Sequence, residues 1–264
     1  MLGKILSLPN DDTRKVVVVA LSLCLVCSLI VSAAAVYLRP MQEANKTQDM
    51  KKNILSVAGL LEAGTNIDET FAERIEVRIV DLRSGEYATD IDAEGFDQRA
   101  AERDTAESES LTKDQDVAGI GRISHYAPVY LLKDGDQTKA VILPVHGYGL
   151  WSTMYGFLAL EPDLNTVSGI TFYAHGETPG LGGEIDNPDW QASWVGRQAF
   201  DGAGAASLEV VKGQVIEGNP NEIHQIDGLS GATLTSKGVS NTMQFWLGEN
   251  GFGPFLAKLS ETGV

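Results

Sequence analysis

The feature that most restricts the fold of this chain is a run of 23 uncharged residues from Val16 to Leu38. Arg14 and Lys15 precede the run and Arg39 follows it. At about 1.5 Å per residue, a helix of this length covers roughly 35 Å, which is enough to cross a hydrocarbon core of about 30 Å. We therefore expect one transmembrane helix over residues 16–38, after a short N-terminal stretch over residues 1–15.

A cleaved signal peptide is the alternative, because residues 33–35 are three alanines that resemble a cleavage site. The run is longer than the apolar region of a usual signal peptide, and its Tyr37 could lie at the membrane interface. Lysines and arginines flank both ends of the run, so counting positive charges does not set its orientation. The two cysteines of the chain, Cys24 and Cys27, lie inside the run. They predict neither a disulfide framework nor a zinc site and are interpreted as small residues facing lipid or a partner.

Charge excludes one class of partner. The net charge is -16 at pH 7, and no basic patch is present of the kind that nucleic-acid binding requires. Acidic substrates are disfavoured for the same reason. The length of 264 residues accommodates the anchor and one large domain.

Residues 39–117 are interpreted as a membrane-proximal region. Apolar spacing predicts an amphipathic helix over residues 47–61, and alternation of apolar and charged residues predicts a strand near residues 75–79. Residues 84–116 carry eleven acidic side chains and few large apolar ones. Such a stretch is expected to bury little surface, as a solvated excursion or a mobile helical insert, with a docking surface as the alternative.

Residues 118–264 are denser in apolar residues and predict a β-rich domain. The segments 129–132 and 140–145 flank a Lys-Asp-Gly-Asp turn and predict a hairpin, and residues 154–160 and 167–173 predict further strands. The expected fold class is α+β: one transmembrane helix followed by a mixed, mainly antiparallel sheet with packed helices.

Residues 227–236, Asp-Gly-Leu-Ser-Gly-Ala-Thr-Leu-Thr-Ser, directly precede a helical pattern over residues 235–247. Ser230 is a good candidate N-cap for that helix. Unpaired amides and the helix dipole would stabilise a phosphate held at Thr233, and Gly231 and Ala232 would let it approach the main chain. An ordinary capped helix is the alternative interpretation.

Two glycine-rich segments carry further chemical content. Residues 147–152, Gly-Tyr-Gly-Leu-Trp-Ser, predict a loop able to face a flat ring, or else a turn with a core tryptophan. In residues 175–184, the sequence Thr-Pro-Gly-Leu predicts a type II turn, because proline fixes φ at its second position and glycine permits a positive φ at its third. The exposed amides of this segment could bind the polar edge of a flat ring, and Leu181 could lie against its face. A long surface loop is the alternative.

The residues Asp227, Ser230, Gly231, Ala232 and Thr233 match the Asp-x-x-Ser-Gly-Ala-Thr pattern of proteins that carry FMN on a threonine. In those proteins a separate flavin transferase joins FMN to the last threonine of the pattern through a phosphoester bond. The resemblance implies that Thr233 is the acceptor in this chain.

Together with the segments 147–152 and 175–183 and the single anchor, this motif makes nearly the whole chain resemble the NqrC family, which belongs to the sodium-translocating NADH:quinone oxidoreductase. The related RnfG-type covalent-FMN proteins of the Rnf electron-transport complex are the second candidate. The resemblance implies a flavoprotein in the bacterial inner membrane, with residues 1–15 on the cytoplasmic side. It also implies a periplasmic domain whose FMN relays electrons between other subunits of a sodium-transporting complex. It implies a flavin site that comprises the five motif residues with Trp151, Glu177, Thr178, Gly180 and Leu181.

Two other classes of function are considered. A hydrolase is disfavoured, because Ala232 stands where a nucleophile elbow closes with glycine and all four histidines precede Ser230. A membrane-anchored scaffold or binding protein without redox function remains an alternative. No Gly-x-Gly-x-x-Gly sequence follows a strand, so we expect no NADH site and no catalytic residues or metal in this chain.

Overall fold

The computed structural model describes residues 9–93 and 95–263, so the first eight residues of the predicted cytoplasmic stretch 1–15 lie outside it. The chain divides into two compact units, Met1–Gln48 and Asp49–Val264. The helices and strands, in chain order, are α2 Thr13–Val57, α3 Ile67–Arg74, β1 Ile75–Asp81, β2 Glu86–Tyr87, α4 Gln98–Arg103, β3 Ser108–Ser110, β4 Arg122–Ser124, β5 Tyr126–Asp134, β6 Gln137–Tyr148, β7 Thr153–Leu160, β8 Val167–Ala174, η1 Gly182–Asp186, α5 Pro188–Ala192, β9 Glu209–Val210, η2 Glu222–His224, β10 Gln225–Ile226, α6 Thr233–Leu247 and α7 Gly253–Thr262.

The helix α2 is continuous over 45 residues, whereas the sequence pattern predicts two separate helices. Residues 39–46 are rich in good helix formers, and an Arg39–Glu43 ion pair of 2.9 Å spans one turn there, so the helix continues although Pro40 lies inside it. It ends at Val57 rather than at residue 61. Gly59 then adopts a φ of 71°, and the Leu60 amide donates to the Leu55 carbonyl at 2.9 Å, which is the usual hydrogen-bonding pattern of a glycine-terminated helix.

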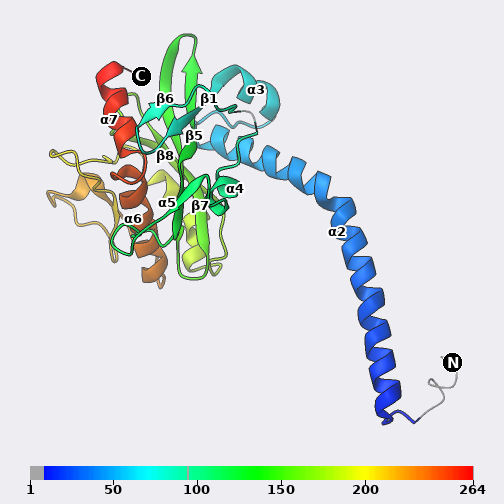
Figure 1. Ribbon diagram of the computed structural model, residues 1–264. Helices are drawn as coiled ribbons and strands as arrows, with labels where there is room; N and C mark the ends of the chain where they lie inside the picture. Colours follow the sequence, from blue (N-terminus) through cyan, green and yellow to red (C-terminus); the bar gives the residue numbers. More distant parts are fainter. Residues whose placement is uncertain (1–8, 94, 264) are drawn as a thin grey trace. The chain divides into compact units, whose positions relative to one another are not determined.

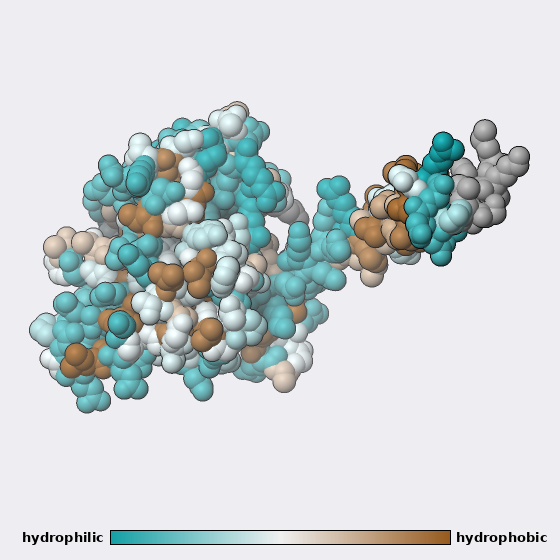
Figure 2. Space-filling view, turned by 90° about the horizontal axis from the view of Figure 1, so that it is seen from below, coloured by the Kyte–Doolittle hydropathy of each residue, from teal (hydrophilic) through white to brown (hydrophobic). Residues whose placement is uncertain are grey.

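The N-terminal part of α2 is long and apolar enough to cross a membrane, by length and composition. Its large apolar side chains are exposed, as in Leu21 at 66% and Tyr37 at 79%. Figure 2 shows these groups as a brown band on the helix, bordered by hydrophilic residues. This pattern fits a single-pass membrane anchor.

The second unit is built on a six-stranded sheet in the order β2-β1-β5-β6-β7-β8, in which every neighbouring pair is antiparallel. A short parallel pair, β9 with β10, and an antiparallel pair, β3 with β4, lie outside it. The predicted hairpin is confirmed as β5–β6, and the predicted strands as β1, β7 and β8. The predicted α+β class with a mainly antiparallel sheet is therefore confirmed, and β1 of the predicted membrane-proximal region belongs to the same sheet.

Both faces of this sheet are covered, as Figure 1 shows. On one face, α6 and α7 pack against β5–β8, and the predicted face of α6, formed by Val239, Met243, Trp246 and Leu247, is fully buried. On the other face, the last turns of α2, residues 49–57, pack with α3 against the same strands. Successive residues of β6 such as Ile142 and Leu143 therefore face different cores, which explains why residues 140–145 of this strand form an unbroken apolar run.

The acidic stretch 84–116 differs from its prediction. It contains α4, whose Gln98 and Ala101 are buried. The Arg99 guanidinium carbon lies 3.4 Å from the centroid of the Tyr155 ring on β7, an arrangement that a cation–π interaction favours. The expectation that the whole stretch buries little surface is wrong for α4, because its polar side chains find aromatic partners on a strand distant in the sequence.

A buried acid–imidazole pair joins α4 to the sheet. Glu102 Oε1 lies 3.3 Å from His146 Nε2 on β6, and the His146 ring stacks on Tyr155. Burial raises the pKa of Glu102 to about 7, and burial together with the nearby Arg99 charge lowers the pKa of His146 to about 3. Both shifts favour the uncharged forms, so between these values the two side chains are a neutral pair rather than an ion pair.

Candidate functional site

Residues 227–233, the motif predicted to hold a phosphate, form the entry to α6. The helix begins at Thr233, and its N-cap is Ala232, without a side-chain cap. The prediction that Ser230 is the N-cap of this helix is therefore wrong. The entry is instead held by the amide of Leu229, which donates to Ser236 Oγ at 3.1 Å one turn into the helix, so the chain needs no hydroxyl cap at 230.

Four hydroxyl side chains lie close together here, and they differ in accessibility. Thr235 is fully buried, and its Oγ1 donates to Glu177 Oε2 at 2.6 Å. Ser236 is buried and holds the Leu229 amide. Ser230 and Thr233 are exposed. Of the two threonines that follow Ala232, only Thr233 thus offers its hydroxyl to solvent.

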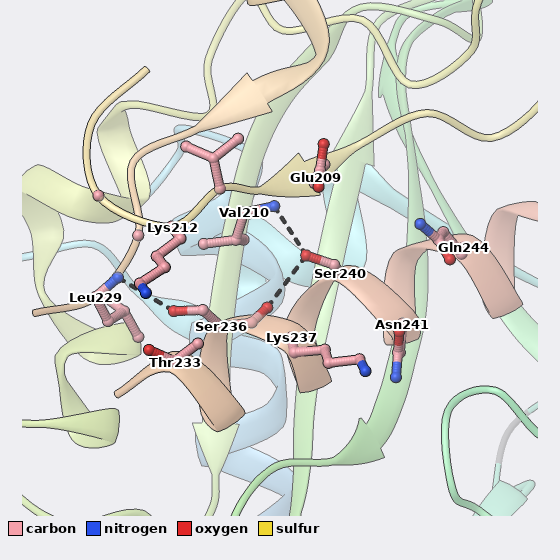
Figure 3. A pocket seen from close by; sticks show the side chains of 13 residues that line it. Glu209, Val210, Lys212, Leu229, Thr233, Ser236, Lys237, Ser240, Asn241 and Gln244 are labelled. Atoms are coloured by element: carbon pink, nitrogen blue, oxygen red, sulfur yellow. Dashed lines mark hydrogen bonds between the residues drawn. The ribbon is translucent and has the colours of Figure 1, made fainter. Parts of the chain in front are cut away.

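A cavity of about 310 Å³ lies beside Thr233, between α6 and the segments that contain β9 and Leu229. Figure 3 shows Thr233, Lys237 and Asn241 along α6, with Lys212 on the opposite wall. Lys237 follows Thr233 by four residues and so lies on the same helix face. Glu209 also lines the cavity, so its two lysines leave one net positive charge. This charge and the unpaired amides of the first helical turn favour an anion attached to Thr233.

Glu177 connects the three segments that the sequence singles out. Its side chain is buried. Oε1 accepts hydrogen bonds from the amides of Leu150, Trp151 and Ser152 at 3.1, 2.9 and 3.4 Å, and Oε2 accepts from Thr235. Burial raises the pKa of Glu177, but the hydrogen bonds from Thr235 and from the three amides outweigh it, and the pKa lies below its ordinary value.

The loop after β8 contacts the motif directly. The amide of Leu181 donates to the Thr178 carbonyl at 3.1 Å, and Gly180 has a φ of 75°, which confirms the predicted tight turn. A Cβ placed on Gly231, whose φ is 71°, would lie 3.0 Å from Leu181 Cδ2. The Leu181 side chain therefore packs over the small residue beside Thr233, while 43% of its surface stays exposed.

The loop between β6 and β7 presents its aromatic side chain outward. Its Gly149 amide donates to the Ser152 carbonyl at 2.8 Å, and Ser152 Oγ accepts from the Gly176 amide at 2.6 Å. Trp151 is 64% exposed and Leu150 is 39% exposed. Trp151 and Leu181 are large apolar groups that a flat ring could cover.

Asp227 has a structural contact that the sequence does not indicate. Its Oδ1 accepts from the Val215 amide at 2.7 Å, and its carbonyl accepts from Trp190 Nε1 at 2.8 Å. The carboxylate thus holds the loop after β9, which carries Lys212, rather than the entry of α6.

The comparisons with known proteins agree with this convergence. The model of the FMN-binding domain family matches residues 149–248, a span that includes Trp151, Glu177, Leu181 and the motif around Thr233. The NqrC protein of Vibrio anguillarum, a component of its Na⁺-translocating NADH-quinone reductase, is 51% identical over 255 residues, which cover 97% of this chain and 98% of that protein. The chain belongs to the NqrC family.

Other members of the NqrC family support the assignment. The corresponding protein of Pseudomonas aeruginosa is 48% identical over 253 residues, covering 95% of this chain and 97% of that one. The crystal structure of NqrC from Shewanella oneidensis matches with a TM-score of 0.76 at 35% identity, covering 83% of this chain and 99% of that chain.

Sequence reasoning did not find the two lysines of the cavity or the role of Ser152. The spacing of four between Thr233 and Lys237 is a local signal that could have been used. Lys212 has no such signal, because it follows β9 and lies more than 20 residues before Thr233 in the sequence. Among the described residues, no group of three or more His, Cys, Asp or Glu side chains could hold a metal ion.

Proposed function

We propose that this chain is a membrane-anchored electron-transfer subunit of a Na⁺-pumping NADH:quinone reductase, and that it carries FMN joined to Thr233 by a phosphoester bond. The observation that carries the proposal is the single exposed threonine hydroxyl at the start of α6, beside a cavity with two lysines and near two exposed apolar side chains. The match to the FMN-binding domain family and the NqrC relatives support the same function.

The residues present fit the cofactor. Lys212, Lys237 and the first-turn amides of α6 would hold the phosphate, and Gly231 leaves room for it beside the main chain. Trp151 and Leu181 would contact the isoalloxazine ring. Bound FMN would supply one-electron and two-electron transfer, with a potential that depends on hydrogen bonds, burial and nearby charge.

The role of the chain's own residues is to attach, orient and shield. Thr233 Oγ1 would form the ester with the flavin phosphorus, with a net loss of one water relative to free FMN, and a flavin transferase would carry out the attachment. The lysines would balance the remaining negative charge of the phosphate. Electrons would come from and pass to other subunits of the complex, with the second unit on the periplasmic side of the inner membrane and no NADH site in this chain.

The attachment residue of FMN and its covalent linkage are tested together in cells that contain the flavin transferase. We expect a band that fluoresces under flavin illumination after denaturing electrophoresis, and a mass increase equal to FMN less one water. Thr233→Ala should abolish both, whereas Thr233→Ser, which restores a hydroxyl, and Thr235→Ala should keep them. A colourless wild-type band would favour the scaffold alternative. Loss of flavin only in Thr235→Ala would place the acceptor at Thr235.

A further inference from the structure

Glu177 is a buried acid whose carboxylate is held by hydrogen bonds alone. Among the described residues, no Lys, Arg or His side chain forms an ion pair with it. Three successive amides, from Leu150, Trp151 and Ser152, point at Oε1, and such a row of amides is an anion-binding nest. Oε2 accepts from the Thr235 hydroxyl and also lies 3.2 Å from the Leu150 amide. Both carboxylate oxygens are therefore used within the protein.

Two glycines, Gly149 and Gly182, lie against this carboxylate. A Cβ on Gly149 would lie 2.6 Å from Glu177 Oε1, and a Cβ on Gly182 would lie 2.8 Å from Glu177 Oε2 and 2.5 Å from Thr235 Oγ1. Contacts this short do not occur for real Cβ atoms. Gly149 of the loop 149–152 and Gly182 of the segment 175–184 thus make room for the Glu177 carboxylate. This carboxylate joins both segments to α6.

We infer that Glu177 is a positioning residue of the flavin site and not a ligand of the flavin itself. Its carboxylate fixes the loop 149–152 so that Trp151 is presented from a rigid backbone, and it holds the Thr235 hydroxyl inside the protein, which leaves Thr233 as the accessible threonine. The part of this inference that concerns the ring rests on the function proposed above, whereas the ordering of the loop does not.

The loop is tested first without flavin, in full-length protein purified in detergent from cells that lack the transferase. Hydrogen exchange of the amides of residues 150–152 is compared between wild type, Glu177→Gln and the control Glu184→Gln. Glu184 lies in the same segment, but its carboxylate accepts from Asn187 Nδ2 at 2.9 Å. We expect exchange at least about tenfold faster in Glu177→Gln, because a neutral amide accepts hydrogen bonds more weakly than a carboxylate, and no change in the control.

The amides of β5 and β6 serve as an internal reference that separates local loosening from loss of the fold. Unchanged exchange at residues 150–152 in Glu177→Gln would overturn the inference. If that variant does not accumulate, Thr235→Val is used in its place. Faster exchange of the same amides is expected, and unchanged exchange would again contradict the inference.

A chemical rescue tests the nest itself. In Glu177→Ala, sodium acetate should restore protection of these amides that sodium chloride at equal ionic strength does not, because acetate can occupy the nest. Failure of acetate to restore protection would count against the nest.

The flavin-loaded protein supplies the second measurement. We expect Glu177→Gln to shift the flavin midpoint potential and to keep covalent flavin, while Glu184→Gln leaves the potential at the wild-type value. A loosened loop with an unchanged potential would show that Glu177 orders the loop without positioning the ring contacts. If wild-type protein carries no flavin at Thr233, the proposed function fails, and the exchange experiment still decides the role of Glu177 in the loop.

Discussion

The neutral pair of Glu102 and His146 predicts an unusual dependence of stability on pH. With a pKa near 7 in the fold and 4.5 as the ordinary value, Glu102 keeps its proton in the folded protein and loses it on unfolding between these pH values. Its contribution to the free energy of unfolding is therefore full below about pH 4.5 and is lost as pH rises to about 7. The difference of about 2.5 pKa units corresponds to about 3 kcal/mol.

His146 acts in the opposite direction. Its pKa falls from 6.5 to about 3, so the folded protein holds it neutral and gains stability as pH rises from about 3 to 6.5. Between about pH 4.5 and 6.5 the two contributions oppose each other in the wild type. Replacing Glu102 with glutamine removes the contribution of Glu102, which falls as pH rises. The contribution of His146, which rises with pH, remains.

Glu102→Gln is thus expected to become more stable relative to wild type as pH rises, by about 3 kcal/mol between pH 4.5 and 7.5. The assay is urea unfolding of the full chain in detergent at several pH values, followed by tryptophan fluorescence. Comparison of the two proteins at each pH cancels the titration of all other groups. A difference that does not change with pH would refute the raised pKa of Glu102, and a difference that changes in favour of wild type would indicate an ion pair of imidazolium with carboxylate.

Three further predictions concern the core, the packing of α6 and the cavity. Phe157→Ala, at a position that is 1% exposed, should lower the free energy of unfolding by about 3–5 kcal/mol in the same urea assay. Gly238→Ala should destabilise by about 1–3 kcal/mol, because its Cβ would lie 2.5 Å from a backbone carbonyl at the end of β6; a neutral result would mean that α6 can move away. Lys212→Gln and Lys237→Gln should each slow flavin attachment by about 2- to 5-fold, measured as flavin fluorescence per protein over time, whereas a basic residue elsewhere on the surface, replaced in the same way, should not.

Much of the local structure follows from the sequence alone, because it depends on neighbours within a few residues. The uncharged run from Val16 to Leu38 predicts the anchor, and alternating or continuous apolar residues predict β1 and β5–β8 of the main sheet but not β2. Pro179 and Gly180 predict the turn in which the Leu181 amide returns to the Thr178 carbonyl, since each residue restricts or permits its own φ.

The functional site could be predicted only as separate pieces. The loop 149–152 joins β6 to β7, Glu177 follows β8, and Thr235 lies on α6, which packs on β6; sheet order and helix packing bring these segments together. The hydrogen bonds between them join residues 25–58 positions apart, beyond the reach of any local periodicity. The same holds for the burial of α4 and for the position of Lys212.

The sequence by itself determined the membrane anchor, the five long strands of the main sheet and the motif that ends at Thr233, because near-neighbour sterics and apolar spacing specify them. Only the tertiary structure decided that Thr235 is enclosed while Thr233 is exposed, that Ser230 does not cap α6, and that Glu177 joins the loops. Accessibility and hydrogen-bond partners depend on which distant segments the sheet places side by side, and that placement is a property of the whole packed unit.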